Sequence, residues 1–104
     1  MFFSPGCDHC QHETEEIIKR KNDFKNIQIV MCTIAPLWEM NDFYKKYKLS
    51  QLSDLVIGRD YQYVLPSFYM IHNFPYLAFY NKNKQLISTF EGTLAVDKIL
   101  KEFK

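Results

Sequence analysis

Two cysteines near the start of the chain, Cys7 and Cys10, constrain the fold more than any other feature of the sequence. The apolar and then turn-forming residues 2–6 precede them, and residues 11–20 follow with a helical pattern. The pair is therefore expected at the point where a strand turns into a helix. Two thiols one helical turn apart can form a disulfide and open it again, which predicts a redox-active dithiol.

The residues around the pair bear on the reactivity of its first sulfur. The first turn of a helix offers unpaired backbone N–H groups and the positive end of a dipole, and both favour a thiolate. Cys7 is therefore expected to be the more acidic of the two thiols. His9 adds positive charge when it is protonated and Asp8 opposes it, so the sequence predicts an intermediate reduction potential.

Other uses of the same cluster stay open. Thiols and imidazoles are good ligands for zinc, but no second pair of such residues follows at ligand spacing. A permanently closed structural disulfide is another alternative, although so short a loop removes little entropy from the unfolded chain. Haem attachment needs a histidine directly after the second cysteine, and Gln11 occupies that position. The metal-ligand candidates are Cys7, His9, Cys10 and His12.

Length and charge narrow the class of protein. A chain of 104 residues with 47% hydrophobic content fits one domain over residues 1–104. The formal charge of +1 lacks the basic excess of a nucleic-acid-binding surface, so no nucleic acid partner is expected. No apolar run reaches the length of a membrane span, and the first residues lack the basic flank of a secretory signal. We expect a monomer that needs no cofactor.

The third cysteine lies in a different setting. Cys32 falls within residues 27–34, a β-branched and almost continuous apolar run that is typical of a strand buried on both faces. Such a position favours an inert, buried side chain over a third redox thiol. Three cysteines are also an odd number, which argues against a secreted scaffold held together entirely by disulfides.

Past this strand, a second helical pattern begins at Pro36 and is expected to end near Lys48. Trp38 lies within it, and a tryptophan on an amphipathic helix more often packs in or beside the core than lines a substrate groove. Residues 50–73 show a looser pattern. The elements expected there are a short strand at 55–57, a turn at 58–60 and a helical turn or two at 66–71.

The last third of the chain predicts a β-hairpin followed by a helix. Residues 75–80 and 85–90 flank a polar turn and are expected to pair as antiparallel strands. Residues 96–103 repeat apolar side chains at helical spacing. The order of elements predicts an α/β fold, with a central mixed β-sheet flanked by helices on both faces. Binding sites in such sheets lie at the carboxyl ends of strands, where the dithiol falls.

With these elements in place, the chain resembles the thioredoxin-like superfamily, and within it the TlpA/ResA-type thiol-disulfide oxidoreductases of bacteria, over essentially its whole length. The resemblance rests on residues 2–13, on residues 74–77 at the start of the hairpin and on residues 86–92 before the last helix. It implies a thioredoxin-like fold in which Cys7 is the attacking sulfur and Cys10 the resolving one. It also implies that Pro75 is a cis-proline beside the dithiol and that Phe74 and Pro75 bind the substrate; an ordinary trans proline that opens an edge strand is the alternative.

The activity that the resemblance implies is thiol–disulfide exchange with protein disulfides or dithiols, supported by an upstream redox donor. Relatives of this type outside the cytoplasm commonly act as reductants. Reduction is therefore the expected direction and an extracytoplasmic, periplasmic location the expected compartment, while a cytoplasmic one stays open. Two alternatives remain. One is a thioredoxin-like binding module with an idle dithiol and a groove formed by Phe74, Tyr76 and Trp38; the other is a metal-binding scaffold that uses the two cysteines and His12.

Three features depart from the family pattern. Phe74 stands where a small or polar residue is common, so substrate specificity does not transfer. Met1 matches the position at which thioredoxins carry a buried carboxylate, which leaves water, His9 or Glu13 to move the proton. Only residues 1–3 precede the turn, so we expect a first strand that is either truncated or naturally very short. Of these two explanations, we favour truncation by a loss of upstream residues.

Overall fold

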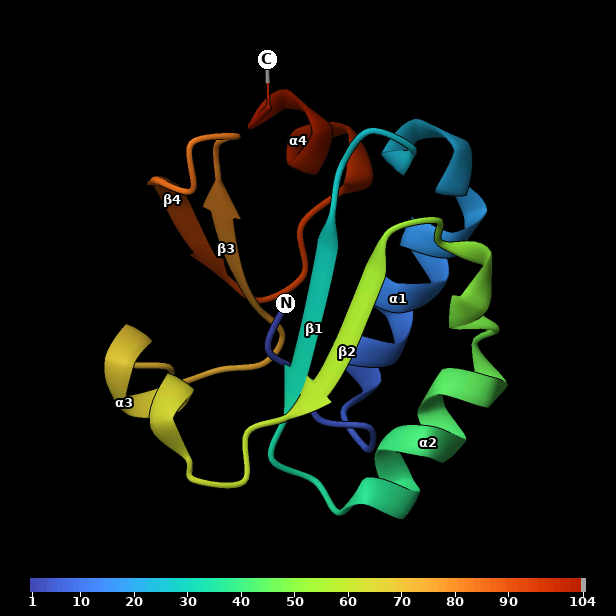
Figure 1. Ribbon diagram of the computed structural model, residues 1–104, viewed down its shortest axis with the longest axis vertical. Helices are drawn as coiled ribbons and strands as arrows, with labels where there is room; N and C mark the ends of the chain where they lie inside the picture. The colour runs from blue at the N-terminus through green and yellow to red at the C-terminus, as the bar shows by residue number, and fades with distance from the viewer. Residues whose placement is uncertain (104) are drawn as a thin grey trace.

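The first three residues of the chain form the middle of a mixed β-sheet. Phe2 bridges in parallel to Cys32 on one side and antiparallel to Tyr76 on the other. Its N–H donates to the Tyr76 carbonyl at 2.8 Å, and the Phe3 N–H donates to the Cys32 carbonyl at 2.9 Å. In this computed structural model, which describes residues 1–103, that very short central strand joins two pairs of longer strands into one sheet (Figure 1).

The two strand pairs differ in direction. Strands β1 (Ile29–Thr33) and β2 (Leu55–Arg59) run parallel, whereas β3 (Tyr76–Tyr80) and β4 (Leu86–Glu91) run antiparallel. The order across the sheet is therefore β2, β1, the segment at Phe2, β3 and β4. The mixed sheet and the antiparallel hairpin predicted from the sequence are confirmed.

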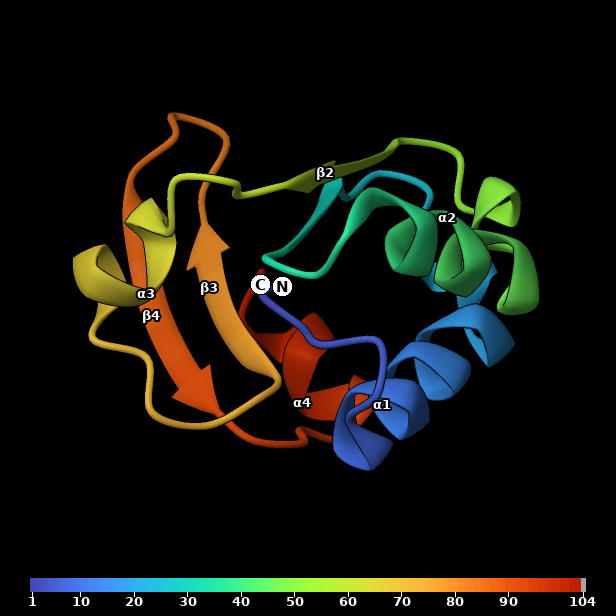
Figure 2. The same cartoon turned by 90° about the horizontal axis from the view of Figure 1, so that it is seen from below.

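Helices lie on both faces of this sheet, as predicted (Figures 1 and 2). α1 and α4 lie side by side on one face, and α2 packs on the same side through Phe43. α3 lies on the opposite face, where the rings of Tyr69 and Tyr76 are 5.5 Å apart. Within residues 1–103, none of the helices is long and apolar enough to cross a membrane. The helices are α1 (Asp8–Lys19), α2 (Leu37–Lys46), α3 (Val64–Tyr69) and α4 (Val96–Lys101), with 3₁₀-helices at Lys21–Phe24 and Leu49–Gln51.

The hydrophobic core lies between the sheet and the three helices α1, α2 and α4. Phe3 is fully buried there, and its ring packs on that of Phe43 with 4.7 Å between the centroids. Burial of such apolar side chains is the main favourable term in folding. Other buried members of this core are Ile17, Phe24, Met31, Leu49, Leu77, Phe79, Val96 and Ile99.

Strand β1 is buried on one face only. Met31 and Thr33 are buried, whereas Val30 is exposed and Cys32 is half-buried. The expectation of a strand buried on both faces, and with it of a fully buried Cys32, is therefore wrong. The reason is that α1, α2 and α4 all pack on one face of the sheet, while the short α3 covers only part of the other.

Strand β2 is longer than the sequence predicted. Gly58 and Arg59 continue the strand, because they pair with Cys32 and Thr33 of β1 in parallel register. The predicted turn at 58–60 is therefore wrong, and the strand predicted at 55–57 extends to Arg59.

The helix that follows also begins earlier than expected. The two carboxylate oxygens of Asp60 accept hydrogen bonds from the N–H groups of Val64 at 3.1 Å and Leu65 at 2.8 Å. These bonds satisfy donors at the start of a helix that have no partner within it. α3 consequently starts at Val64, ahead of the helical turn predicted at 66–71.

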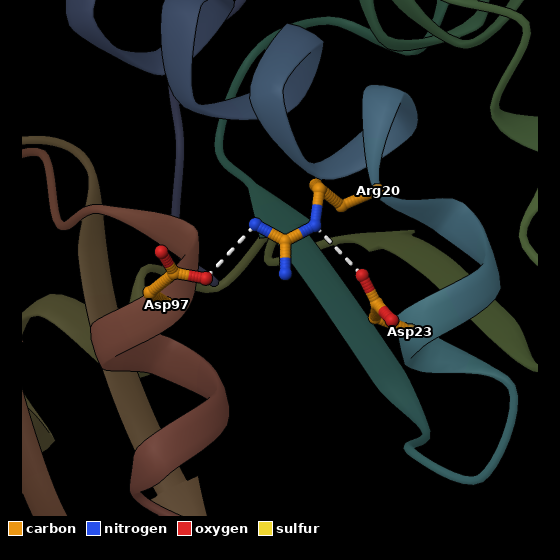
Figure 3. Close-up of polar contacts among 3 residues, drawn as sticks. All are labelled: Arg20, Asp23 and Asp97. Carbon is orange, nitrogen blue, oxygen red and sulfur yellow. Dashed lines mark hydrogen bonds and ion pairs between the residues drawn. The ribbon is translucent and has the colours of Figure 1, made fainter.

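An ion-pair cluster joins the end of α1 to α4. The guanidinium of Arg20 donates to Asp23 at 2.7 Å and to Asp97, in the first turn of α4, at 2.9 Å (Figure 3). All three side chains are exposed, so water screens their charges. The packing of the two helices against the core, more than this cluster, therefore holds them together.

Replacing Phe3 by Ala is expected to lower the free energy of unfolding by about 3–5 kcal/mol, because the change removes a fully buried ring and leaves a cavity. Urea denaturation followed by circular dichroism measures the loss. Phe68→Ala is the matched control, since Phe68 is exposed on α3 and its truncation is expected to cost less than about 0.5 kcal/mol. Equal losses in the two variants would contradict the position of the core.

Candidate active site

The two thiols of the predicted pair lie within one turn of backbone at the start of α1. Cys7 is the N-cap residue of this helix and Cys10 lies in its first turn. The Cys10 N–H donates to Cys7 Sγ at 3.4 Å, so the sulfur takes the position of a capping acceptor. The helix begins at Asp8, three residues before the predicted range of 11–20, and the pair lies at the predicted turn from strand to helix.

Hydrogen bonds fix the turn that precedes α1. The Cys7 N–H donates to the Ser4 carbonyl at 3.1 Å, and the side chain of Gln11 donates through Nε2 to the Pro5 carbonyl at 2.8 Å. The Gln11 N–H also donates to the Cys7 carbonyl at 3.0 Å. The loop that carries Cys7 is therefore tied to the first turn of the helix in both directions.

The two thiols differ in their access to solvent. Cys7 is partly exposed, whereas Cys10 is fully buried, and both are free thiols in this structure. Burial raises the pKa of Cys10 to about 12, with a smaller contribution from the Cys7 thiol beside it. Cys10 therefore stays protonated at neutral pH, and Cys7 is the sulfur that a partner molecule can reach.

A segment from the other end of the chain lies against the outer sulfur. The peptide bond between Phe74 and Pro75 is cis. The Cys7 thiol points toward the Phe74 carbonyl, with 3.9 Å between sulfur and oxygen. Pro75 is buried, and its carbonyl accepts from the Gly92 N–H at 2.8 Å. The structure thus brings Cys7, Phe74 and Pro75 together although they are far apart in sequence.

The residues around Phe74 orient its backbone toward the dithiol. The ring of Phe74 packs against that of Phe2, with 5.5 Å between centroids, so the carbonyl and not the ring faces the sulfur. Just before it, the carboxylate of Glu91 accepts from the His72 N–H and from the Asn73 side chain, each at 3.3 Å. The segment leading to Pro75 is therefore held by side-chain as well as backbone hydrogen bonds.

The two residues between the cysteines face solvent. Asp8 and His9 are both exposed in the first turn of α1. Water and salt weaken the effect of charges at such positions. Their influence on the reduction potential stays a prediction.

Glu13 is a buried carboxylate one helical turn after Cys10. It accepts the Leu94 N–H at 2.8 Å. Burial raises the pKa of Glu13, while the Leu94 N–H and the nearby His12 partly offset this effect. The charge of Glu13 in turn contributes to the raised pKa of Cys10. Of the three proton carriers considered from the sequence, Glu13 is therefore the one held beside the buried thiol.

The groove considered from the sequence is not formed by the residues expected. Trp38 is exposed and not packed in the core, because α2 buries Met40 and Phe43 instead. Tyr76 is buried, so it does not line a groove with Phe74 and Trp38. In residues 1–103, no three His, Cys, Asp or Glu side chains are placed to hold a metal ion, so the metal-scaffold alternative lacks a ligand set.

No protein-family model matches the chain, and no significant sequence match to a curated protein is found. Solved structures do match. A secreted disulfide oxidoreductase of Mycobacterium tuberculosis, homologous to Escherichia coli DsbE, superposes with a TM-score of 0.78 over 97% of this chain and 75% of that chain, at 18% identity. The chain has the thioredoxin-like fold.

Two further thioredoxin-like structures extend the comparison. StoA from Bacillus subtilis gives a TM-score of 0.77 at 18% identity, covering 97% of this chain and 77% of that one. DsbF of M. tuberculosis, solved in mixed oxidised and reduced forms, gives a TM-score of 0.80 at 17% identity. The match covers 97% of this chain and 73% of that one. The predicted fold class is confirmed.

Glu13 predicts a pH-dependent stability. A carboxyl group whose pKa is raised by folding binds its proton more tightly in the folded state, so the free energy of unfolding falls as the pH rises through that range. The fall is expected to begin near pH 4.5, the ordinary pKa of the group, and to end above the raised value. Urea unfolding at a series of pH values measures it.

Glu13→Gln isolates this effect, since an amide oxygen can still accept the Leu94 N–H but does not titrate. Relative to the wild type, the variant is expected to become progressively more stable as the pH rises. Glu15→Gln changes an exposed carboxylate on the same helix and is the control, expected to keep the pH dependence of the wild type. A stability difference between Glu13→Gln and wild type that does not change with pH would contradict the assignment.

Proposed function

We propose that the chain is a thiol–disulfide oxidoreductase that exchanges its Cys7–Cys10 dithiol with disulfides of protein substrates. The observation that carries the proposal is the pairing of an accessible thiol and a buried one in a single helical turn, beside the Phe74–Pro75 segment. A similar fold in a disulfide oxidoreductase of M. tuberculosis supports it.

In the first step, Cys7 attacks the substrate. The Cys10 N–H donates to Cys7 Sγ, so a hydrogen-bond donor already faces the sulfur that attacks. This thiolate attacks one sulfur of the substrate disulfide, so that a new bond forms between Cys7 and the substrate. The other substrate sulfur leaves with the bonding electron pair and takes up a proton.

In the second step, Cys10 resolves the mixed disulfide. Cys10 loses its proton and attacks Cys7 Sγ, which forms the Cys7–Cys10 disulfide and releases the second substrate thiol. The raised pKa of Cys10 makes this proton hard to remove, and Glu13 is proposed as its acceptor because it is buried one turn away. The substrate gains two electrons and two protons, and the protein leaves oxidised.

Phe74 and Pro75 are proposed to form the surface on which the substrate chain lies during exchange. The Phe74 carbonyl already points at Cys7, so a substrate sulfur bonded to Cys7 brings its neighbouring backbone to the same place. That carbonyl is then an acceptor for a substrate N–H. Asp8 and His9 are proposed to modulate the potential of the pair from the solvent side.

Reduction is the proposed direction, with an upstream donor that returns the disulfide to the dithiol. An extracytoplasmic location is proposed with it. The similar fold of a secreted M. tuberculosis oxidoreductase and of an exposed lipoprotein thioredoxin of Streptococcus pneumoniae supports this location.

The two cysteines are expected to respond differently to substitution. With dithiothreitol as electron source, the wild type is expected to accelerate the reduction of insulin disulfides, and Cys7→Ser to lose this acceleration. When no dithiothreitol is added, Cys10→Ser is expected to stop at the mixed disulfide, which mass spectrometry detects as a covalent adduct with substrate, because the resolving sulfur is gone and no other thiol cleaves the adduct.

Cys32→Ser is the matched control, since Cys32 lies in β1 outside the pair, and it is expected to keep the rate of the wild type. Equal insulin reduction by the wild type and Cys7→Ser would reject the proposed function. The same assay run in reverse, with a reduced unfolded substrate, compares the two directions, and faster oxidation than reduction would reject the reductant role.

A further inference from the structure

β2 forms one edge of the sheet, and its outer side has no partner strand within residues 1–103 (Figure 1). The Ile29 N–H donates to the Asp54 carbonyl at 3.2 Å, and the Asp60 N–H donates to the Thr33 carbonyl at 2.8 Å. Because backbone groups alternate along a strand between its two sides, the even-numbered residues of β2 bond to β1. The odd-numbered residues direct their N–H and C=O groups outward, away from β1. They are Leu55, Ile57 and Arg59.

The two edges of the sheet differ in how well they can accept a further strand. Edge strands of natural proteins usually carry a feature that prevents more pairing, such as a lysine, a proline or a bulge. β2 pairs with β1 in unbroken register over its five residues, and none of them is lysine or proline. β4, at the other edge, pairs with β3 through a register shift between Phe79 and Tyr80. β2 is therefore the regular edge of this sheet.

An exposed apolar pair reaches this edge on the face of the sheet that α3 covers only in part. Val56 lies directly opposite Val30 of β1, and the two side chains are 50% and 46% exposed. Gly58, two residues along the same face, has open space where a side chain would be. Cross-strand pairs of β-branched side chains stabilise a sheet. A strand that places such a side chain beside Val56 would therefore extend the pair across the edge.

We propose that β2 pairs in antiparallel direction with β2 of a second copy of the chain, about a two-fold axis at Val56, so that the two sheets join into one. In this register Val56 faces Val56 of the second copy, and Leu55 faces Ile57 of the second copy. Leu55 and Ile57 are residues whose N–H and C=O groups point outward, so each Leu55–Ile57 pair can exchange two hydrogen bonds. The exposed valines of both copies then form one apolar stripe.

The charges around β2 favour a second copy over a strand of unrelated sequence. Asp54 stands just before β2 and Arg59 ends it, so antiparallel pairing brings the acidic start of each strand to the basic end of the other. The next possible register has Ile57 on the axis and places Asp54 directly opposite Asp60 of the second copy. Like charges directly opposite each other are destabilising. The register with Val56 on the axis avoids this repulsion.

The proposed dimer leaves both dithiols open and is independent of the proposed function. Cys7 follows the central segment at Phe2 and Phe3, and β1 lies between that segment and the edge. An edge of five residues is expected to bury less than the roughly 1,000 Å² of a stable interface, so the dimer should dissociate on dilution. The structure thus leads to a weak dimer where the sequence alone predicted a monomer.

The test is sedimentation velocity from micromolar to millimolar protein concentrations, with dithiothreitol present to prevent intermolecular disulfides. The dimer fraction of the wild type is expected to rise with concentration. Val56→Lys is expected to weaken dimerisation at least about tenfold, because it removes the valine pair and places two ammonium groups opposite each other on the axis. Ile87→Lys is the matched control, since Ile87 is 45% exposed on β4 at the other edge, and it is expected to dimerise as the wild type does.

A charge exchange at the axis tests the register itself. Val56→Glu alone is expected to dimerise as poorly as Val56→Lys. An equal mixture of the two variants is expected to recover at least the dimer fraction of the wild type, because a lysine then faces a glutamate across the axis. A mixture of Ile87→Lys with Ile87→Glu is the control and is expected to match the wild type. Circular dichroism establishes that each variant is folded.

Three results would overturn the inference. The first is a wild type that stays monomeric at every concentration. The second is a dimer that Ile87→Lys dissociates and Val56→Lys does not, which would assign the contact to β4. The third is a mixture of the two Val56 variants that remains as monomeric as either variant alone. None of these results bears on insulin reduction, so the proposed function is tested separately.

Discussion

The backbone hydrogen bonds of Phe2 and Phe3 are the constraint on which the site depends. They attach the first residues to β1 on one side and to β3 on the other, and so make one sheet of two strand pairs. The chain leaves this central position directly into the turn that carries Cys7. Because β3 begins immediately after Pro75, the same bonds bring that sulfur to the Phe74 carbonyl. Phe3 anchors the arrangement by placing a fully buried ring in the core.

A steep change in solvent exposure across one helical turn gives the two sulfurs different chemistry. Cys7 can meet a partner at the surface, whereas burial keeps Cys10 protonated until the first exchange has occurred. Glu13 lies on the buried side of the same turn, with its own pKa raised by burial. In the proposed second step Glu13 accepts the Cys10 proton as a carboxylate, and the burial that raises the pKa of Glu13 makes it a stronger base for this task. The order of the two proposed steps thus follows from where the helix begins.

The sequence predicted the fold better than it predicted the surroundings of the dithiol. Hydrophobic periodicity and turn residues are local signals, and they located the strand-to-helix turn at Cys7 and the hairpin after Pro75. Which face of a strand is covered depends on how distant helices pack, so the half-buried state of Cys32 and the exposure of Trp38 were predicted wrongly. Glu13 shares a helix face with Cys10, but its partner Leu94 is 81 residues away and no local pattern indicates the contact.

The most direct test of the central claim is a redox equilibrium in which Cys7 and Cys10 act as one couple. The protein is equilibrated with glutathione mixtures of known potential, its thiols are trapped by alkylation, and the labelled peptides are mapped by mass spectrometry. Cys7 and Cys10 are expected to become protected from alkylation together, in a single two-electron transition, while Cys32 stays a free thiol throughout. The ratio of oxidised to reduced protein is expected to change tenfold for each step of about 30 mV in potential. Protection of Cys7 as a glutathione adduct while Cys10 remains labelled at every potential would contradict it.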